Sequence, residues 1–305
     1  MFLMLCATKV IYLCQRTKYM FLFCTTGLSH YICDMKNFSI GVIISTYNNP
    51  RWLEKTLWSY CAQTIVPDEI IVADDGSDDE TRRLIDSFKM MLPLRHVWHE
   101  DDGFRKTKIL NEAIKAATAD YLIFTDQDCV ARQDFVAVHK HYARKGYILS
   151  GGYFKLPMDI SERLTYDDIR NGRAFRLRWL RGQGLKRTFK CTKLVQSKAF
   201  GAFMNFITPT KATWNGMNSS GWREDILAVG GFDERMQYGG EDREMGERMF
   251  NNGIKSKQIR YRAIVLHLDH SRPYVNKEAW ERNMAIRRET KRNRTIVTPY
   301  GIKRS

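Results

Sequence analysis

The sequence lacks any pair of cysteines spaced Cys-x-x-Cys, and its seven cysteines are scattered irregularly over 305 residues. That absence excludes zinc-ribbon and thioredoxin-type motifs, and an odd, irregular set argues against a secreted disulfide scaffold. We therefore expect a reducing compartment. No internal repeat or low-complexity tract is present, and a composition of 44% apolar and 27% charged residues excludes a wholly disordered chain.

The sequence also lacks an apolar run long enough to span a bilayer. Residues 1–34 are apolar, but three basic residues interrupt them, and the longest uncharged stretch, Tyr19–Cys33, has 15 residues. A spanning helix needs about 20, and the small-residue cleavage site of a signal peptide is missing too. Three interpretations stay open for residues 1–34: spurious upstream translation, a membrane-associated segment, or an added structural element. Met35 begins a sequence typical of a soluble α/β domain.

Acidic residues are scarce relative to basic ones, at 34 against 49, so the formal charge is +15. Such a charge favours polyanionic partners: nucleic acid, anionic lipid or phosphorylated substrates. Between Arg170 and Lys198 there are ten basic residues and no acidic one, with three aromatic residues interleaved. None of the familiar nucleic-acid-binding motifs appears, so nucleic acid is not expected as the partner. A solvated basic face and docking on anionic lipid headgroups remain as interpretations.

What the sequence does have is a regular alternation of buried strands and helices. Strands are predicted at 39–45, 69–73, 94–98 and 121–124, and helices from 50, over 79–90 and over 106–117. This alternation predicts a parallel sheet with right-handed crossovers. Polar groups follow three of the strands, at Thr46–Asn48, Asp74–Asp75 and Asp126–Asp128. Because ligands bind beyond the carboxyl ends of such strands, we expect these groups to share a cleft.

Beyond residue 146 the pattern loosens. A strand is predicted at 151–154, helices at 161–170 and 241–250, and a last strand at 263–267. Fewer side chains can be placed here than in the first half.

Two acidic pairs at strand ends suggest ligand chemistry. Asp126 and Asp128 offer hard oxygen ligands suited to Mg²⁺ or Mn²⁺; the alternative is a helix N-cap with solvated loop acids. Asp74 or Asp75 could accept a hydrogen bond from a nucleobase or a ribose hydroxyl. Because Asp-Gly is also a common turn former, one of these two is expected to be structural.

The later part of the chain offers a candidate base and candidate metal ligands. Glu241 and Asp242 follow two glycines, which allow close approach of a ligand, and one carboxylate there could take a proton from a substrate hydroxyl. The alternative is N-terminal charge on a solvated helix. Either His267 or His270 could add an imidazole ligand to a metal site, although a lone histidine more often packs or faces solvent.

From about Phe38 to Pro273 these segments resemble the family 2 glycosyltransferases, which have the GT-A fold. The resemblance is carried by VIISTYNNP, IIVADDGSDDET and YLIFTDQDC, in that order. The later segments WREDILAVGGFDERMQYGGEDREM and VLHLDH resemble the galactosyltransferase-type C-terminal half of some bacterial members. The resemblance implies an α/β fold whose central, mainly parallel sheet is flanked by helices, with a smaller acceptor-side subregion.

The activity that the resemblance implies is inverting transfer of a sugar from a UDP-sugar to a hydroxyl of a glycan or lipid-linked acceptor. It further implies Mn²⁺ or Mg²⁺ as cofactor, a role in polysaccharide or lipopolysaccharide synthesis, and a hexosyl or N-acetylhexosaminyl group as cargo. The enzyme would be cytoplasmic and peripheral to the inner face of the membrane. A sugar nucleotidyltransferase is the alternative, but the loop after the first strand has no glycine. A second alternative is a non-catalytic basic binding module.

On the donor side, the resemblance assigns roles to four residues. Ser45 and Tyr47 would line the nucleotide pocket, Asp75 would hold the uracil, and Asp126 would lie near the ribose. Many members carry an Ala-Arg-Asn-x-Gly segment that is replaced here by residues 106–113. The charge facing the diphosphate is therefore assigned to Lys106, with its neighbours Arg105 and Lys108 as alternatives.

On the catalytic side, the resemblance makes Asp128 the direct metal ligand and His267 a further one, with His270 close enough to compete. Asp242, together with Glu241, would supply the catalytic base and touch the acceptor.

Two further residues, Trp222 and Arg223, are expected to shape the sugar site. The implied division of the chain is an uncertain extension (1–34), a nucleotide-sugar-binding half (35–145), an acceptor-binding and catalytic half (146–275) and a basic C-terminal tail (276–305).

Overall fold

The computed structural model describes residues 37–271 and 276–303, so the extension 1–34 lies outside the described residues. The strands are β1 (Ile40–Thr46), β2 (Glu69–Asp74), β3 (Leu94–Trp98), β4 (Tyr121–Asp126), β5 (Cys129–Ala131), β6 (Tyr147–Ser150), β7 (Gly152–Lys155), β8 (Ser219–Trp222), β9 (Lys255–Gln258) and β10 (Ile264–His267). The helices are α1 (Pro50–Cys61), α2 (Asp79–Phe88), α3 (Lys106–Ala116), α4 (Phe135–Tyr142), α5 (Met158–Arg163), α6 (Tyr166–Arg170), α7 (Leu177–Gly182), α8 (Lys198–Ile207), α9 (Arg223–Ala228), α10 (Glu241–Asn251) and α11 (Lys277–Arg292), with 3₁₀ turns η1 (Arg173–Phe175) and η2 (Phe189–Leu194).

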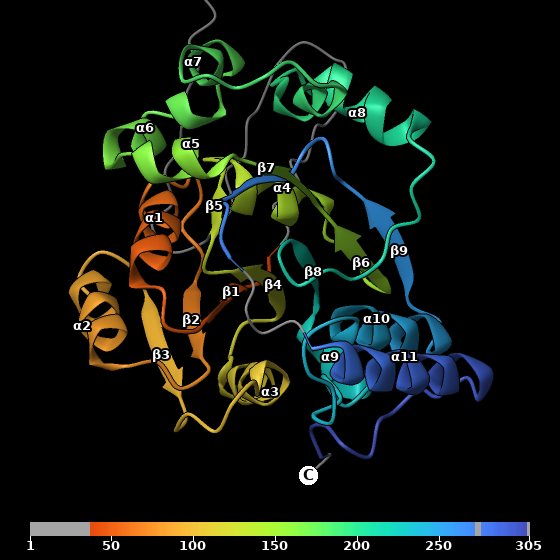
Figure 1. The fold of residues 1–305 in the computed structure, drawn as a ribbon. Coiled ribbons are helices and arrows are strands. Elements are labelled where there is room, and N and C mark those ends of the chain that lie inside the picture. Colours follow the sequence, from red (N-terminus) through yellow and green to blue (C-terminus); the bar gives the residue numbers. More distant parts are fainter. Residues whose placement is uncertain (1–36, 272–275, 304–305) are drawn as a thin grey trace, which may run out of the picture. The chain divides into compact units, whose positions relative to one another are not determined.

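The central sheet has seven strands in the order β3-β2-β1-β4-β8-β6-β9 (Figure 1). β1 pairs in parallel with β2 and β4, and β2 pairs in parallel with β3, which confirms the mainly parallel sheet predicted from the alternation. β8 is antiparallel to both of its neighbours, β4 and β6. Strands from beyond residue 146 therefore extend the same sheet, and the division at residue 145 runs through one sheet.

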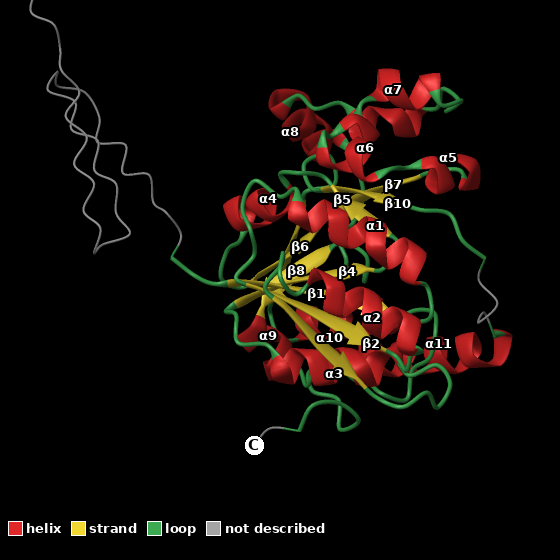
Figure 2. Cartoon of the chain, turned by 90° about the vertical axis from the view of Figure 1, so that its left-hand side faces the viewer, coloured by secondary structure: helices red, strands yellow, loops and turns green. Residues whose placement is uncertain are grey.

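Helices cover both faces of this sheet (Figure 2). Successive residues of β1 point to opposite faces: Val42 and Ile44 pack with α1 and α2, whereas Ile43 packs with α3, α9 and α10. Every residue of β1 and β2 is buried. A ligand can therefore reach these strands only at their ends, and in sheets of this kind it binds at the carboxyl ends.

A second, three-stranded sheet in the order β5-β10-β7 lies beside the first. Leu266 and Phe154 on one face pack with α5, α6, α7 and η2, while Val265 on the other joins the core over α1 and α4. This small sheet brings His267, at the end of β10, into register with Cys129, the residue after Asp128.

Two sequence predictions need correction. The helix predicted at 161–170 is two short helices, α5 and α6, because Leu164 leaves the helical conformation and Thr165 starts α6 with a capping box. The residues 276–305, predicted as a basic tail, contain the helix α11, which packs along α10 through ion pairs of Arg287 and Lys291 with Glu247. Within the described residues, every helix is too short or too polar to cross a bilayer.

Candidate functional site

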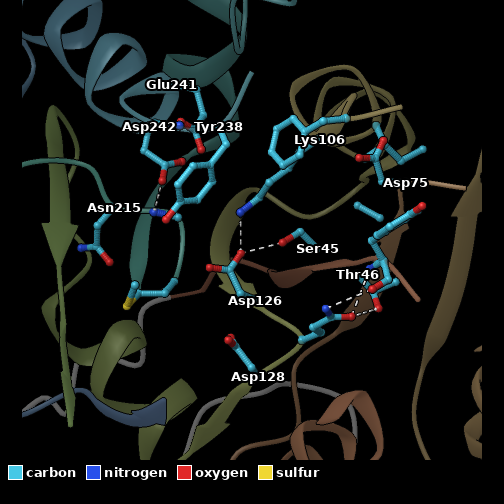
Figure 3. Close-up of a pocket in the computed structure, with 18 of the residues that line it drawn as sticks. Ser45, Thr46, Asp75, Lys106, Asp126, Asp128, Asn215, Tyr238, Glu241 and Asp242 are labelled. Atoms are coloured by element: carbon cyan, nitrogen blue, oxygen red, sulfur yellow. Dashed lines mark hydrogen bonds and ion pairs between the residues drawn. The ribbon is translucent and has the colours of Figure 1, made fainter. Parts of the chain in front are cut away.

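A cavity of about 490 Å³ opens at the carboxyl ends of β1, β2 and β4. It is lined by Ser45, Thr46, Tyr47, Ala73, Asp75, Gly103, Phe104, Lys106, Ile109, Asp126, Gln127, Asp128, Trp214, Asn215, Gly216, Met217, Tyr238, Gly239, Gly240, Glu241, Asp242, Arg243, His267 and His270. The walls thus come from segments far apart in the chain, as the strand-end pattern predicts. Figure 3 shows the labelled side chains facing one another across it.

On the floor of the cavity, Asp126 ends β4 and is held by two donors. Ser45 Oγ donates to Asp126 Oδ1 over 2.6 Å, and Lys106 Nζ donates to the same oxygen over 2.7 Å (Figure 3). Arg105 instead pairs with Asp102, and Lys108 is not part of the lining. Of the three cations considered from sequence, Lys106 is therefore the one that reaches the cavity.

Asp74 and Asp75, at the end of β2, have different roles. Asp74 accepts from Ser77 N over 2.9 Å and lies 2.8 Å from His96 Nε2, so it stabilises the turn after the strand. Asp75 lines the cavity and is contacted by His99 Nε2 at 2.8 Å and Arg105 N at 3.0 Å. Burial raises the pKa of Asp75, and the hydrogen bond from His99 partly offsets this rise.

Gln127, one of the polar groups predicted at the end of the fourth strand but without a role of its own, ties the first loop to the Asp126-x-Asp128 segment. Its Oε1 accepts from Thr46 Oγ1 and from Tyr47 N, at 2.5 and 3.0 Å, and its Nε2 donates to Tyr47 O over 3.2 Å. Tyr47 is 45% exposed, and its hydroxyl donates to Asp101 over 3.0 Å. Tyr47 is thereby placed at the rim of the cavity rather than in its floor.

A group of candidate metal ligands lies at the junction of β4 and the small sheet. The ligand atoms of Asp128, His267 and His270 all lie within 4.8 Å of one another. His267 Nδ1 faces Leu268 O at 2.9 Å, and His270 Nδ1 faces Ser271 O at 2.7 Å. Because a carbonyl only accepts, Nδ1 carries the proton in each ring, and Nε2 is left to act as a ligand.

Both Nε2 atoms are aimed at the same oxygen. His270 Nε2 lies 2.8 Å, and His267 Nε2 3.5 Å, from Asp128 Oδ2. Burial alone would raise the pKa of Asp128, but when the two rings are protonated, the hydrogen bond from His270 and the charges of His267 and His270 outweigh burial and lower the pKa. Loss of the Nε2 proton makes each ring neutral and frees that nitrogen to act as a ligand. One carboxylate and two imidazoles fit a divalent first-row transition metal, a group that includes Mn²⁺. No helix begins at Asp126 or Asp128, which removes the N-cap interpretation.

Opposite this group, α10 opens with Glu241 and Asp242. Gly239 and Gly240 precede them with φ of 107° and 95°, a conformation that favours glycine. Glu241 Oε2 accepts from Gly239 N over 2.8 Å, and burial, with the charge of Asp242, raises the pKa of Glu241 to about 7.

Asp242 has one oxygen bound and one available. Its Oδ2 accepts from Gly216 N over 2.8 Å, while Oδ1 is buried and makes no hydrogen bond within the described part of the chain. Burial raises the pKa of Asp242; the charge of Lys106 opposes this rise and that of Asp126 adds to it. A buried carboxylate of raised pKa with a free oxygen in a cavity suits a general base, which favours the functional interpretation over solvated N-terminal charge.

Lys106 lies between the acids of the two sides. Burial alone would lower the pKa of its ammonium group, but Asp126, Asp242 and Glu241 together raise it, so the group stays charged. Its charge offsets the repulsion among carboxylates that otherwise face one another across a buried space.

The segment 214–217, just before β8, also lines the cavity, and no sequence motif marked it. Asn215 holds its place by donating to Ser150 Oγ over 3.2 Å and to Asn218 O over 3.1 Å. A Cβ at Gly216 would lie 2.7 Å from Asp242 Oδ2. A backbone donor at a glycine leaves no side-chain pattern, so only the structure could identify it.

The assignment of Trp222 and Arg223 to the sugar site does not fit the structure. Because β8 is antiparallel to β4, Trp222 pairs with Tyr121 at the start of β4, at the opposite end of the sheet from the cavity. Trp222 packs with Phe38 and Tyr121, and Arg223 donates to the carbonyls of Ile114 and Lys115. Both residues lie at the amino-terminal ends of the parallel strands.

With this geometry established, the chain can be compared with known proteins. Residues 41–207, more than half of the chain, match the family model for glycosyl transferase family 2. Residues 202–271 match the model described as the N-terminal domain of galactosyltransferase.

Among curated relatives, a validoxylamine A glucosyltransferase of Streptomyces hygroscopicus subsp. limoneus is 30% identical over 225 residues, which are 70% of this chain and 48% of the relative. A chondroitin synthase of Escherichia coli is 25% identical over 72% of this chain and 33% of its own length. This chain therefore spans half or less of the length of these relatives.

Solved structures share the fold at low identity. TarS of S. aureus (residues 1–349, in complex with UDP-GlcNAc) aligns over 82% of this chain and 65% of its own, with a TM-score of 0.54 and 17% identity. The mannosyltransferase PcManGT of Pyrobaculum calidifontis, in complex with GDP-Man and Mn²⁺, aligns over 81% and 61%, with a TM-score of 0.50 and 20% identity. These likenesses confirm the GT-A fold.

Proposed function

This chain belongs to glycosyltransferase family 2, and from that premise we propose that it transfers a sugar from a UDP-sugar to a hydroxyl group of a glycan or lipid-linked acceptor, with inversion at the anomeric carbon. The observation that carries the proposal is the single cavity in which Asp75, Asp128 and Asp242, acids from three distant segments, meet. A UDP-sugar is favoured as donor because Asp75 can accept from a uracil N–H. Proteins of the same fold are known in complex with UDP-GlcNAc and with GDP-Man, so both nucleotides belong in the donor test.

The proposed donor end of the cavity lies over β1, β2 and β4. Asp75 and the loop at Tyr47 would hold the base, and Asp126, fixed by Ser45 and Lys106, would lie near the ribose. Asp128, His267 and His270 would hold a Mn²⁺ or Mg²⁺ ion, whose charge would neutralise the departing diphosphate. The ammonium of Lys106 adds a fixed positive charge on the same side of the cavity.

The proposed chemical step uses the free oxygen of Asp242. Asp242 Oδ1 takes the proton of the acceptor hydroxyl, and the resulting oxygen attacks the anomeric carbon from the face opposite the diphosphate. The new C–O bond forms as the bond to the diphosphate breaks, so the anomeric configuration inverts. The hydrogen bond from Gly216 N holds the other carboxylate oxygen and thereby fixes the direction in which Oδ1 points.

Two variants separate donor binding from catalysis. We expect Asp128→Ala to weaken UDP binding in the presence of Mn²⁺ and Asp242→Asn to leave it unchanged, as measured by titration calorimetry. Both should lower turnover of the productive UDP-sugar by about 10²–10³, because each removes one preorganised group. Equal UDP affinity for the wild type and both variants would contradict the metal assignment, and full activity of Asp242→Asn would contradict the base.

A further inference from the structure

We propose that the outer face of α8, together with the basic segment before it, is a docking surface for an anionic lipid bilayer. We call this surface the α8 face and define it by the exposed apolar residues Phe189, Val195, Phe203, Phe206 and Ile207 and the exposed cations Arg176, Arg178, Arg181, Lys186, Arg187, Lys190 and Lys198.

α8 turns its large apolar side chains toward solvent rather than toward the protein. Gly201 and Met204 face the protein, where a Cβ at Gly201 would lie 2.8 Å from Tyr261 O. The opposite stripe contains Phe203, Phe206 and Ile207, which are 57%, 89% and 48% exposed. A surface helix normally presents polar residues to water, and a contiguous group of exposed apolar side chains marks a site of interaction.

Polar contacts fix this orientation of α8. Gln258 Nε2, at the end of β9, donates to Asn205 O and Thr208 O over 2.5 and 3.0 Å, and Tyr261 N donates to Asn205 Oδ1 over 3.0 Å. Ser197 caps the helix by accepting from Phe200 N over 3.3 Å. The helix cannot rotate its phenylalanines inward without losing these hydrogen bonds.

The charge of the segment that leads into α8 points to the partner. Between Asp168 and Glu224 the sequence has no acidic residue. The seven exposed cations of the α8 face form no ion pair within the described residues. Burial lowers the pKa of Lys193 to about 8, with smaller contributions from the like charges of Arg260 and Lys190.

Apolar side chains that enter the acyl region, flanked by cations that reach the headgroups, are typical of a helix lying in a membrane interface. Nucleic acid would also be attracted by this charge, and the exposed phenylalanines could stack on bases, but the exposed aliphatic residues Ile207 and Val195 could not, and none of the familiar nucleic-acid-binding motifs is present. The observations therefore favour an anionic lipid surface, such as the cytoplasmic leaflet of a membrane.

The α8 face is connected to the candidate active site. Lys193, in η2, donates to Tyr153 O over 3.0 Å, and the Tyr153 ring lies 6.1 Å from that of His267. In both views α7 and α8 lie on the side of the small sheet away from the central sheet (Figures 1 and 2). A lipid-linked acceptor would then reach the cavity from the docked side; this last step rests on the proposed function, whereas lipid binding itself does not.

Flotation of the full-length chain with vesicles tests the proposal. We expect it to float with vesicles of phosphatidylcholine and phosphatidylglycerol at low salt, and not with phosphatidylcholine alone. The double variant Phe203→Ser/Phe206→Ser should lower the partition coefficient roughly tenfold or more, and Arg181→Glu/Lys186→Glu by at least about 30-fold. Because all four side chains are exposed, the variants should keep the thermal midpoint of the wild type.

Two control variants match these changes elsewhere on the protein. Met90→Ser/Met91→Ser removes exposed apolar side chains at the end of α2, and Arg282→Glu/Arg288→Glu makes the same change of charge on α11. Both should bind vesicles as the wild type does.

Three outcomes would overturn the proposal. Unchanged flotation of Phe203→Ser/Phe206→Ser would mean that another segment, such as residues 1–36, makes the lipid contact. Sedimentation velocity without lipid that shows a wild-type dimer and a monomeric double variant would assign the α8 face to a second copy. Binding of an oligonucleotide through the same cations, without flotation, would assign it to nucleic acid. Sugar transfer to a soluble acceptor should be unaffected by the α8-face variants, so failure of this proposal is distinguishable from failure of the proposed function.

Discussion

At the scale of single residues, the site depends on how one carboxylate is held. Asp242 is fixed by a backbone N–H at Gly216, a position where any side chain would press on the carboxylate. The proposed base is therefore aimed by a glycine, and its direction should be sensitive to a single added methyl group.

We expect Gly216→Ala to lower turnover by about tenfold to 10²-fold while UDP affinity stays within twofold, because a misplaced catalytic group costs on this order. The added Cβ would meet Asp242 Oδ2 at 2.7 Å and push it from its position. Steady-state kinetics and calorimetry measure the two effects. Gly182→Ala, at the end of α7, is the control because its Cβ would meet nothing within 4 Å. If Gly216→Ala kept full turnover, the aiming role of the glycine would be wrong.

Glu241 gives a prediction about pH. Its pKa is raised to about 7 in the folded protein from the ordinary value of 4.5, so the folded state binds the proton more tightly than the unfolded state. Stability linked to this group therefore falls as the pH rises from 4.5 through 7. Replacement of Glu241 by Gln removes the loss of stability that comes from ionising this buried carboxyl group.

We accordingly expect Glu241→Gln to raise the thermal midpoint relative to wild type more at pH 8 than at pH 5. Differential scanning fluorimetry at both pH values measures the difference. Gln can still accept from Gly239 N, so the loop contact is kept. A shift of equal size at both pH values would mean that Glu241 does not titrate as proposed.

At the scale of elements, α11 supports the helix that carries the acid pair. Asn283 is buried, and its side-chain amide donates to Gln237 O, Tyr238 O and Gly239 O at 2.8, 3.4 and 3.0 Å. The loop that leads into Glu241 is thus held by a helix beyond residue 271, where both family-model matches have ended.

We expect Asn283→Ala to lower the free energy of unfolding by about 1–3 kcal/mol, because it leaves half-buried carbonyls of this loop without donors. Turnover should fall more than UDP affinity, since the loop positions Glu241 and Asp242 rather than the donor end of the cavity. Denaturant titration, kinetics and calorimetry separate these effects, with the exposed neighbour Arg288→Ala as control. Loss of stability with unchanged turnover would make Asn283 purely structural.

Elements with strong local signals were predictable. β1, β2, β3 and β4 and the helices between them match the sequence predictions within a few residues, because apolar runs and helical periodicity act over short distances. α8 was not predicted, since its apolar face points outward and its sequence pattern does not reveal which side is covered. The misplacement of Trp222 and Arg223 has a similar cause: the sense of β8 is set by its partners β4 and β6.

The candidate site was predictable in part for the same reason. Asp75, Asp126 and Asp128 lie at the carboxyl ends of parallel strands. The topology therefore predicts that they gather at the same end of the sheet. The pairing of Asp242 with Gly216 N joins the start of α10 to the loop before β8, and neither segment has a pattern that indicates the other. His270 and His267 could not be separated by spacing, and the structure brings both to Asp128.

At the scale of the whole molecule, the cavity joins the two segments matched by the family models. The proposed donor end lies over the first segment, and Asn215, Asp242 and His267 come from the second. A ligand that fills it contacts both segments at once, so binding should stabilise the entire folded chain rather than one part.

We expect the productive UDP-sugar, with Mn²⁺, to raise the thermal midpoint by roughly 5–10 °C at about 100 times its dissociation constant. A thermal-shift panel of nucleotide sugars, with and without Mn²⁺, would rank the donors. Asp128→Ala should lose the part of the shift that depends on Mn²⁺. The absence of a response to any UDP compound would contradict the proposed donor class.

The position of β8 has a consequence for synthesis of the chain. β4, ending at residue 126, has its open edge covered by β8, which begins at residue 219. A ribosome adding about 5–20 residues per second would need roughly 5–20 s to make the chain between them. During that interval the nascent chain exposes a bare, hydrophobic strand edge, which makes it a candidate client for chaperones and vulnerable to intermolecular pairing.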